Sequence, residues 1–145
     1  MDRILTTDNP EDVKVLREIS RETTWEEIEQ LDLINRLREA NDKVAWTDGC
    51  GLAAIQIGIP VKVAWFRIDG REEVLVNPEF CFGIGEYIAV EGCLSIPNKQ
   101  TKVKRYHEIE YMNNGRKKKA KGFKANVIQH EMDHMDGILN TDKEI

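Results

Sequence analysis

Hydrophobic residues recur at helical spacing near the start of the chain. Apolar side chains stand every three residues from Ile28 to Leu37, so they share one face of a helix. Thr24 precedes Glu27 by three residues, which is the spacing of a capping box at a helix start. The pattern predicts one amphipathic helix of about four to five turns. It begins near Thr24 and ends before the glycine-containing residues 48–51.

Strand-like patterns occupy the middle of the chain. They cover the stretches 61–68, 73–76, 86–90 and 101–112. Asp69-Gly70 separates the first two stretches, and Asn113-Asn114-Gly115 follows the last, so both are predicted to be hairpin turns. Short strands bracketed by helices, without repeated βαβ units, predict an α+β fold with antiparallel sheets.

A second helix is predicted over residues 122–136, ending at Gly137. Phe123, Val127, His130 and His134 form one stripe along it, and its other sides are also largely apolar. A helix that is apolar nearly all round is expected to be buried. The expected architecture is therefore a set of antiparallel sheets around this central helix, with a further helix toward the N-terminus.

Composition narrows the class of protein. A chain of 145 residues with 41% hydrophobic and 32% charged residues fits a single domain over 1–145 rather than a disordered segment. The net charge of −5 gives no whole-molecule attraction to nucleic acid, so no specific nucleic-acid partner is expected. The three cysteines form no CxxC pair, which favours a reducing compartment. Cys81, between two phenylalanines, is expected in the core.

The chain carries no pattern for export or for a membrane. Residues 1–8 lack a basic segment followed by an apolar run, so no secretory signal is predicted. No apolar stretch approaches the ~20 residues that a membrane span needs. We expect a cytoplasmic protein without a membrane partner.

The candidate chemistry is concentrated in residues 129–134. His130 and His134 are four positions apart on the predicted helix, so both imidazoles can bind one metal ion. Glu131 lies beside the first histidine and can act as a general base on a water at the metal. Cys93 offers a thiolate as third ligand, and three protein ligands leave a fourth position open, as in catalytic sites. The pattern predicts a metal-dependent hydrolase.

Several alternatives compete with this interpretation. In one alternative the two histidines and Cys93 are core residues that bind no metal. In another, Gln56 is a solvated loop residue. A structural site would recruit a fourth ligand from Cys50, Cys81 or His107. A zincin-type endopeptidase also uses two histidines and a glutamate, and a metal-stabilised binding module would have no catalytic activity.

Three runs together resemble the signature motifs of the peptide deformylases. They are, in chain order, Gly49-Cys50-Gly51-Leu52-Ala53-Ala54-Ile55-Gln56, Glu91-Gly92-Cys93-Leu94-Ser95 and Gln129-His130-Glu131-Met132-Asp133-His134. The resemblance extends over most of the chain and implies antiparallel sheets around a central metal-bearing helix. It also implies a reaction, hydrolysis of the N-formyl group from the initiator methionine of new polypeptides, which releases formate.

The resemblance implies a role for each matching residue. Cys93, His130 and His134 would hold the metal, and Glu131 would be the acid and base. Gln56 and the backbone N–H of Leu94 would stabilise the oxyanion. The substrate would lie against Cys50, Gly51 and Gly92, and the stripe of Phe123 and Val127 would line a pocket for the methionine side chain.

The resemblance also implies a cofactor and partners. The cofactor is one divalent metal ion, natively Fe²⁺, with Zn²⁺, Ni²⁺ or Co²⁺ as substitutes. The partners are N-formylmethionyl nascent peptides and, transiently, the ribosome. The basic run at 116–121 is expected to be a solvated sheet edge, with attraction to ribosomal RNA as the alternative. Two residues depart from the family pattern: Cys50 replaces an aliphatic residue, and Gln100 stands where many members have arginine.

Overall fold

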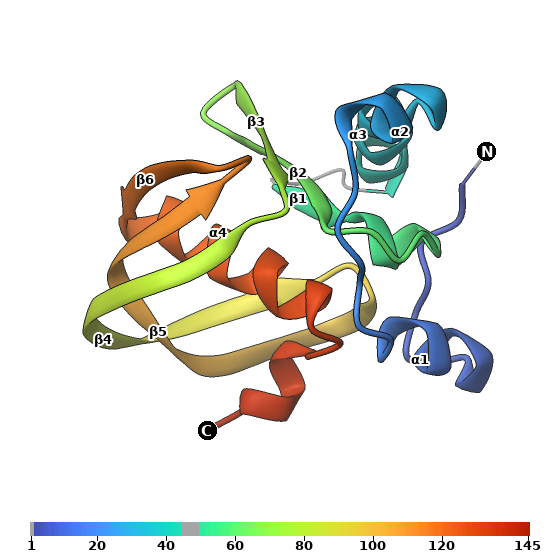
Figure 1. Cartoon of the computed structure of the whole chain (residues 1–145). Helices are drawn as coiled ribbons and strands as arrows, with labels where there is room; N and C mark the ends of the chain where they lie inside the picture. The colour runs from blue at the N-terminus through green and yellow to red at the C-terminus, as the bar shows by residue number, and fades with distance from the viewer. Residues whose placement is uncertain (1, 45–49) are drawn as a thin grey trace.

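Two three-stranded antiparallel sheets surround one helix in this computed structural model, which describes residues 2–44 and 50–145. The first sheet contains β1 (Gly51–Ala53), β2 (Val63–Ile68) and β3 (Arg71–Val76), in that order. The second contains β4 (Glu79–Cys93), β5 (Ile96–Asn113) and β6 (Arg116–Lys121). Helix α4 (Gly122–Met135) contacts strands of both sheets, and Figure 1 shows it enclosed by them. The predicted α+β class and central helix are confirmed.

The two predicted hairpin turns are present. Asp69 and Gly70 join β2 to β3 with φ angles of 52° and 76°, and Asn114 and Gly115 join β5 to β6 with 51° and 77°. Consecutive left-handed residues match the right-handed twist of the flanking strands, which is why Asp-Gly and Asn-Gly pairs favour such turns.

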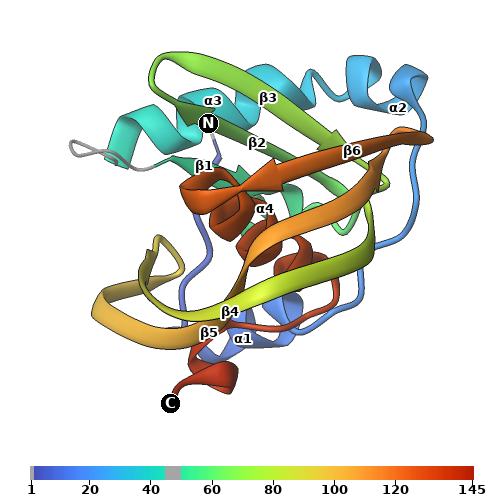
Figure 2. The same cartoon turned by 90° about the vertical axis from the view of Figure 1, so that its left-hand side faces the viewer.

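Strands β4 and β5 are much longer than the sequence pattern predicted. They have 15 and 18 residues and form a curved antiparallel ribbon that wraps around α4 (Figure 2). Two register shifts, near Phe80 and near Cys93, interrupt the pairing. β4 is an edge strand and much of it faces solvent. The expectation that Cys81 is a core residue is therefore wrong, since Cys81 and both flanking phenylalanines are exposed.

The predicted N-terminal amphipathic helix is two helices. α2 (Trp25–Gln30) and α3 (Leu33–Val44) are separated at Asp32, whose φ of 51° is incompatible with a continuous α-helix. Thr24 caps α2 by accepting a hydrogen bond from the Glu27 backbone N–H at 3.2 Å, as predicted. The Glu27 carboxylate does not complete the capping box, because it pairs with Arg21.

Short elements near both ends of the chain were not predicted. Helix α1 (Pro10–Leu16) starts at Asn9, whose side chain accepts a hydrogen bond from the Glu11 N–H, and Pro10 occupies its first turn. A 3₁₀ turn, η2 (Asn140–Lys143), follows α4. The α3 helix packs on β1 and β2, and its apolar stripe forms a second core cluster with them.

Helix α4 has the predicted extent. It ends before Gly137, which has a φ of 73° as expected of a glycine after a helix. Ala125, Ile128 and Met135 are buried in the core between the sheets. Phe123 is an exception to the predicted burial, because it is 59% exposed at the start of the helix. Within the described residues, no helix is long and apolar enough to cross a membrane.

Candidate active site

Three side chains of the kinds that bind metals meet where α4 passes the end of β4. His130 and His134 are one turn apart on α4, and their Nε2 atoms are 3.2 Å from each other. Cys93 is the last residue of β4, and its Sγ atom is 3.5 Å from His134 Nε2. All three donor atoms lie within 4.8 Å of one another. Among the described residues, no other cysteine or histidine joins this group, so a fourth ligand from Cys50, Cys81 or His107 is not indicated.

These distances can be compared with those of a bound metal. Tetrahedral bonds of ~2.05 Å to nitrogen and ~2.3 Å to sulfur would separate two nitrogens by about 3.3 Å and nitrogen from sulfur by about 3.6 Å. The observed 3.2 Å and 3.5 Å are close to both values. Burial opposes ionisation of the Cys93 thiol, but the neighbouring His134 and His130 rings hold its pKa well below its ordinary value. The donor set therefore fits one divalent ion bound through a thiolate and two imidazoles.

A buried network of charges orients the first histidine. His130 Nδ1 donates to Glu91 Oε1 at 2.8 Å, which leaves Nε2 to face Cys93. Arg105, only 3% exposed, binds the Glu91 carboxylate through two nitrogens at 2.6 and 2.9 Å. A third nitrogen of Arg105 donates to Asp133 at 2.7 Å. Burial acts to raise the pKa of Glu91, but the hydrogen bonds from Arg105 and His130 outweigh it and hold this pKa at about 2.

Glu131 is buried beside the three donors without being one of them. It is 3% exposed, and its Oε1 atom has no hydrogen-bond partner among the described residues. Burial raises the pKa of this carboxyl above its ordinary value. A Cβ atom at Gly51 would lie 2.8 Å from Glu131 Oε2 and 2.9 Å from Phe66 Cβ. Gly51 is therefore the residue that lets the start of β1 pass close to the carboxylate.

Gln56 lies in the 3₁₀ turn η1 (Ala54–Ile57) with its amide fixed at both ends. Its Oε1 atom accepts from the Ala53 N–H at 2.9 Å, and its Nε2 atom donates to Ser95 Oγ at 3.0 Å. Nε2 is also 3.8 Å from Cys93 Sγ. Gln56 is 2% exposed, so it is not the solvated loop residue of the alternative interpretation. Its N–H donors are held next to the candidate metal ligands.

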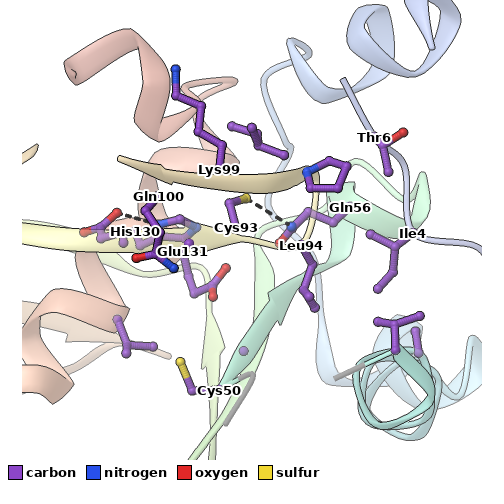
Figure 3. A pocket seen from close by; sticks show the side chains of 18 of the residues that line it. Ile4, Thr6, Cys50, Gln56, Cys93, Leu94, Lys99, Gln100, His130 and Glu131 are labelled. Atoms are coloured by element: carbon purple, nitrogen blue, oxygen red, sulfur yellow. Dashed lines mark hydrogen bonds and ion pairs between the residues drawn. The ribbon is translucent and has the colours of Figure 1, made fainter. Parts of the chain in front are cut away.

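A cavity of about 1120 Å³ opens onto these groups. Figure 3 shows Gln56, Cys93, His130 and Glu131 gathered in one part of it, with Cys50 beyond Glu131. Every residue predicted for the site lines this cavity except His134, which is 1% exposed. The predicted lining residues are Cys50, Gly51, Gln56, Gly92, Cys93, Leu94, Phe123, Val127, His130 and Glu131. Gly49, which belongs to the first motif, lies outside the described residues.

Four residues near the ligands were not singled out from the sequence. Glu91 and Ser95 lie within the run that contains Cys93, where a carboxylate partner for a ligating histidine was a reasonable expectation. Asn126 is four residues before His130 and so on the same helix face. Arg105 stands in the middle of a strand with no local signal, and only the tertiary fold brings it to Glu91.

Comparisons with known proteins agree with this geometry. The family model described as polypeptide deformylase matches residues 1–144. Peptide deformylase 1 of Bacillus subtilis is 44% identical over 114 residues, which cover 74% of this chain and 71% of that protein. The peptide deformylase of Dictyoglomus thermophilum is 38% identical over 113 residues, 74% of each chain.

A solved structure has the same fold over nearly the whole length. The peptide deformylase of Thermotoga maritima superposes with a TM-score of 0.86 at 30% identity, covering 100% of this chain and 98% of that one. The fold, the three motifs and the matched length lead to one conclusion. The chain belongs to the polypeptide deformylases, the metal-dependent hydrolases that remove the N-formyl group from newly made polypeptides.

Proposed function

We propose that residues 1–145 act as one catalytic domain in which Cys93, His130 and His134 bind a single divalent metal. The observation that carries this proposal is the match of the nitrogen–nitrogen and nitrogen–sulfur distances to a tetrahedral site. Fe²⁺ is the native ion in this proposal, and Zn²⁺, Ni²⁺ or Co²⁺ would substitute for it at the same mixed thiolate and imidazole donors. When bound, the ion would lower the pKa of water toward neutrality and polarise the formyl oxygen.

Glu131 is the proposed proton carrier. Its carboxylate is buried beside the donors, and one of its oxygens has no partner among the described residues, so it is available to accept a proton from water. Burial raises its pKa, which makes the carboxylate a better base than an exposed glutamate. The same proton would then pass from Glu131 to the nitrogen of the departing methionine.

Gln56 and the backbone N–H of Leu94 are the proposed donors to the developing oxyanion. The Gln56 amide cannot rotate freely, because Ala53 and Ser95 hold its two ends. Leu94 lies in the turn between β4 and β5 and also lines the cavity. Donors that are oriented before reaction stabilise charge without reorganisation, and one such donor typically contributes about 3–4 kcal/mol.

The cavity would take the N-formylmethionyl end of a nascent peptide. In this proposal the peptide backbone runs past Cys50, Gly51 and Gly92, where small side chains leave room, and Phe123 and Val127 contact the methionine side chain. Phe123 supports this role because a large apolar side chain that is 59% exposed gains a partner when substrate binds. A transient contact with the ribosome in the cytoplasm would supply these substrates.

Formate release tests the proposal most simply. The protein, purified without oxygen and loaded separately with Fe²⁺, Zn²⁺ or Ni²⁺, would be incubated with formyl-Met-Ala-Ser and with acetyl-Met-Ala-Ser. We expect formate from the first peptide only, with both peptide bonds intact. Cleavage within the peptide would indicate an endopeptidase, and absence of reaction with every metal would indicate a binding module. Metal analysis of the protein as purified identifies the native ion.

A further inference from the structure

One polar side chain interrupts the apolar wall of the cavity. Asn126 lies on α4 between Phe123 and Val127 and lines the cavity with them and with Val90 on β4. It is 7% exposed, so its amide is largely withdrawn from bulk water. Burying an amide in such a place destabilises the protein unless its N–H donors and its oxygen find hydrogen-bond partners.

The amide has one hydrogen-bond partner among the described residues, and that partner is not part of the cavity lining. Asn126 Nδ2 donates to the hydroxyl of Tyr87 at 3.3 Å, and Tyr87 is a β4 residue that does not line the cavity. Among the described residues this is the one hydrogen bond of the Asn126 side chain. An amide NH₂ group carries two N–H donors, so one N–H of this cavity-lining residue has no partner among the described residues. The Tyr87 hydroxyl fixes the plane in which that donor lies.

We propose that the Asn126 amide donates to the thioether sulfur of the substrate's first side chain and so makes the enzyme selective for methionine over an all-carbon side chain of the same shape. This inference rests on the proposed function, because it places the methionine side chain between Phe123 and Val127. Asn126 is one turn before His130, so a peptide whose formyl group is near the metal ligands has its first side chain in this region.

The chemistry predicts how large the selectivity is. The thioether sulfur is a weak acceptor, whereas norleucine has a methylene group in its place. With norleucine bound, the second N–H of Asn126 is desolvated and has no partner, and sites built to donate a hydrogen bond reject such analogues. One neutral hydrogen bond of this kind corresponds to about a threefold to tenfold preference. Tyr87 acts as a positioning residue for the amide.

The test compares formyl-Met-Ala-Ser with formyl-norleucyl-Ala-Ser. For each variant, kcat/KM is measured for both peptides, and the dissociation constants of Met-Ala-Ser and norleucyl-Ala-Ser are measured by titration calorimetry on the metal-loaded protein. The variants are Asn126→Leu, which replaces the amide by two methyl groups on the same branched skeleton, and Tyr87→Phe, which removes only the hydroxyl. Tyr106→Phe is the matched control, since Tyr106 lies on β5 outside the cavity lining.

We expect wild type and Tyr106→Phe to prefer methionine about threefold to tenfold in both measurements. In Asn126→Leu the ratio should fall to about one, and in Tyr87→Phe it should lie between that value and the wild-type ratio. An unchanged ratio in Asn126→Leu, or a wild-type ratio of one, overturns the inference. If Asn126→Leu does not fold, an unchanged ratio in Tyr87→Phe overturns it. If neither peptide is deformylated by wild type, the proposed function fails, and the binding ratios still decide the role of Asn126.

Discussion

His130 Nδ1 is 2.8 Å from Glu91 Oε1, so a carboxylate on the β4 edge strand sets the orientation of a candidate metal-ligating ring on α4. The same carboxylate is held by two nitrogens of the buried Arg105. Partners of this kind fix the tautomer of the histidine and typically change metal affinity by about 10–100-fold when they are lost.

Glu91→Gln should therefore weaken metal binding by about 10–100-fold without removing any ligand. The glutamine keeps the shape of the side chain but loses the charge that Arg105 and the His130 N–H both bind. Competition with a chelator of known affinity gives the dissociation constant. Glu108→Gln, a carboxylate exposed on β5, is the matched control and should leave the affinity unchanged. Equal affinities in the two variants would mean that Glu91 does not orient His130.

Gln56→Glu should lower kcat by about 10²–10³-fold with little change in KM. The variant keeps the oxygen that accepts from the Ala53 N–H but replaces the N–H donors by a second oxygen. It therefore loses the stabilisation of the negative charge that develops only in the transition state. Steady-state kinetics and metal content would be measured on the same sample. A change confined to KM would make Gln56 a substrate-binding residue.

Gly51→Ala should destabilise the fold by about 1–3 kcal/mol, because the added Cβ would overlap Phe66 and the Glu131 carboxylate. Gly92→Ala is the comparison, since the nearest atom to its added Cβ, Gln100 Nε2, is at an ordinary 3.6 Å. We expect that variant to stay within about 0.5 kcal/mol of wild type. Urea unfolding of both proteins measures the difference, and similar values would contradict the close approach at Gly51.

Cys50 should be the cysteine whose modification blocks the enzyme. Cys50 lines the cavity, whereas Cys81 is exposed on β4 away from it. A bulky alkylating agent should therefore modify Cys81 without loss of activity and modify Cys50 with loss of activity, and a bound substrate analogue should protect Cys50 alone. Cys50→Val should stay active and become insensitive. Mass-spectrometric mapping follows each site, and inactivation that tracks Cys93 instead would show that Cys50 lies outside the substrate path.

Local sequence signals predicted the centre of this molecule well. Two kinds of feature depend only on neighbouring residues and could be predicted from the sequence. They are the spacing of His130 and His134 within one helix and the turns at Asp69-Gly70 and Asn114-Gly115. The break at Asp32 was missed because the apolar pattern runs through it without interruption, while a single left-handed residue ends the helix.

Features that depend on contacts between distant parts of the chain could not be predicted from the sequence. Arg105 reaches Glu91 only because the long β4–β5 ribbon pairs in one register, and no local pattern at Arg105 indicates a buried charge. Cys81 has core-like neighbours but lies on an edge strand, and the strand order that exposes it is a property of the whole sheet. The candidate ligands were therefore predictable, and most of the residues that support them were not.

Glu131→Ala is the most direct test of the proposed mechanism. Metal content and formate release from formyl-Met-Ala-Ser would be measured on one preparation of the variant and one of wild type. Because Glu131 lies beside the three donors without joining them, the variant should keep the metal of the wild type. Its turnover should fall by at least about 10²–10⁴-fold, the usual effect of losing a proton carrier. Loss of the metal together with the activity would make Glu131 a ligand, and full activity with metal bound would remove it from the reaction.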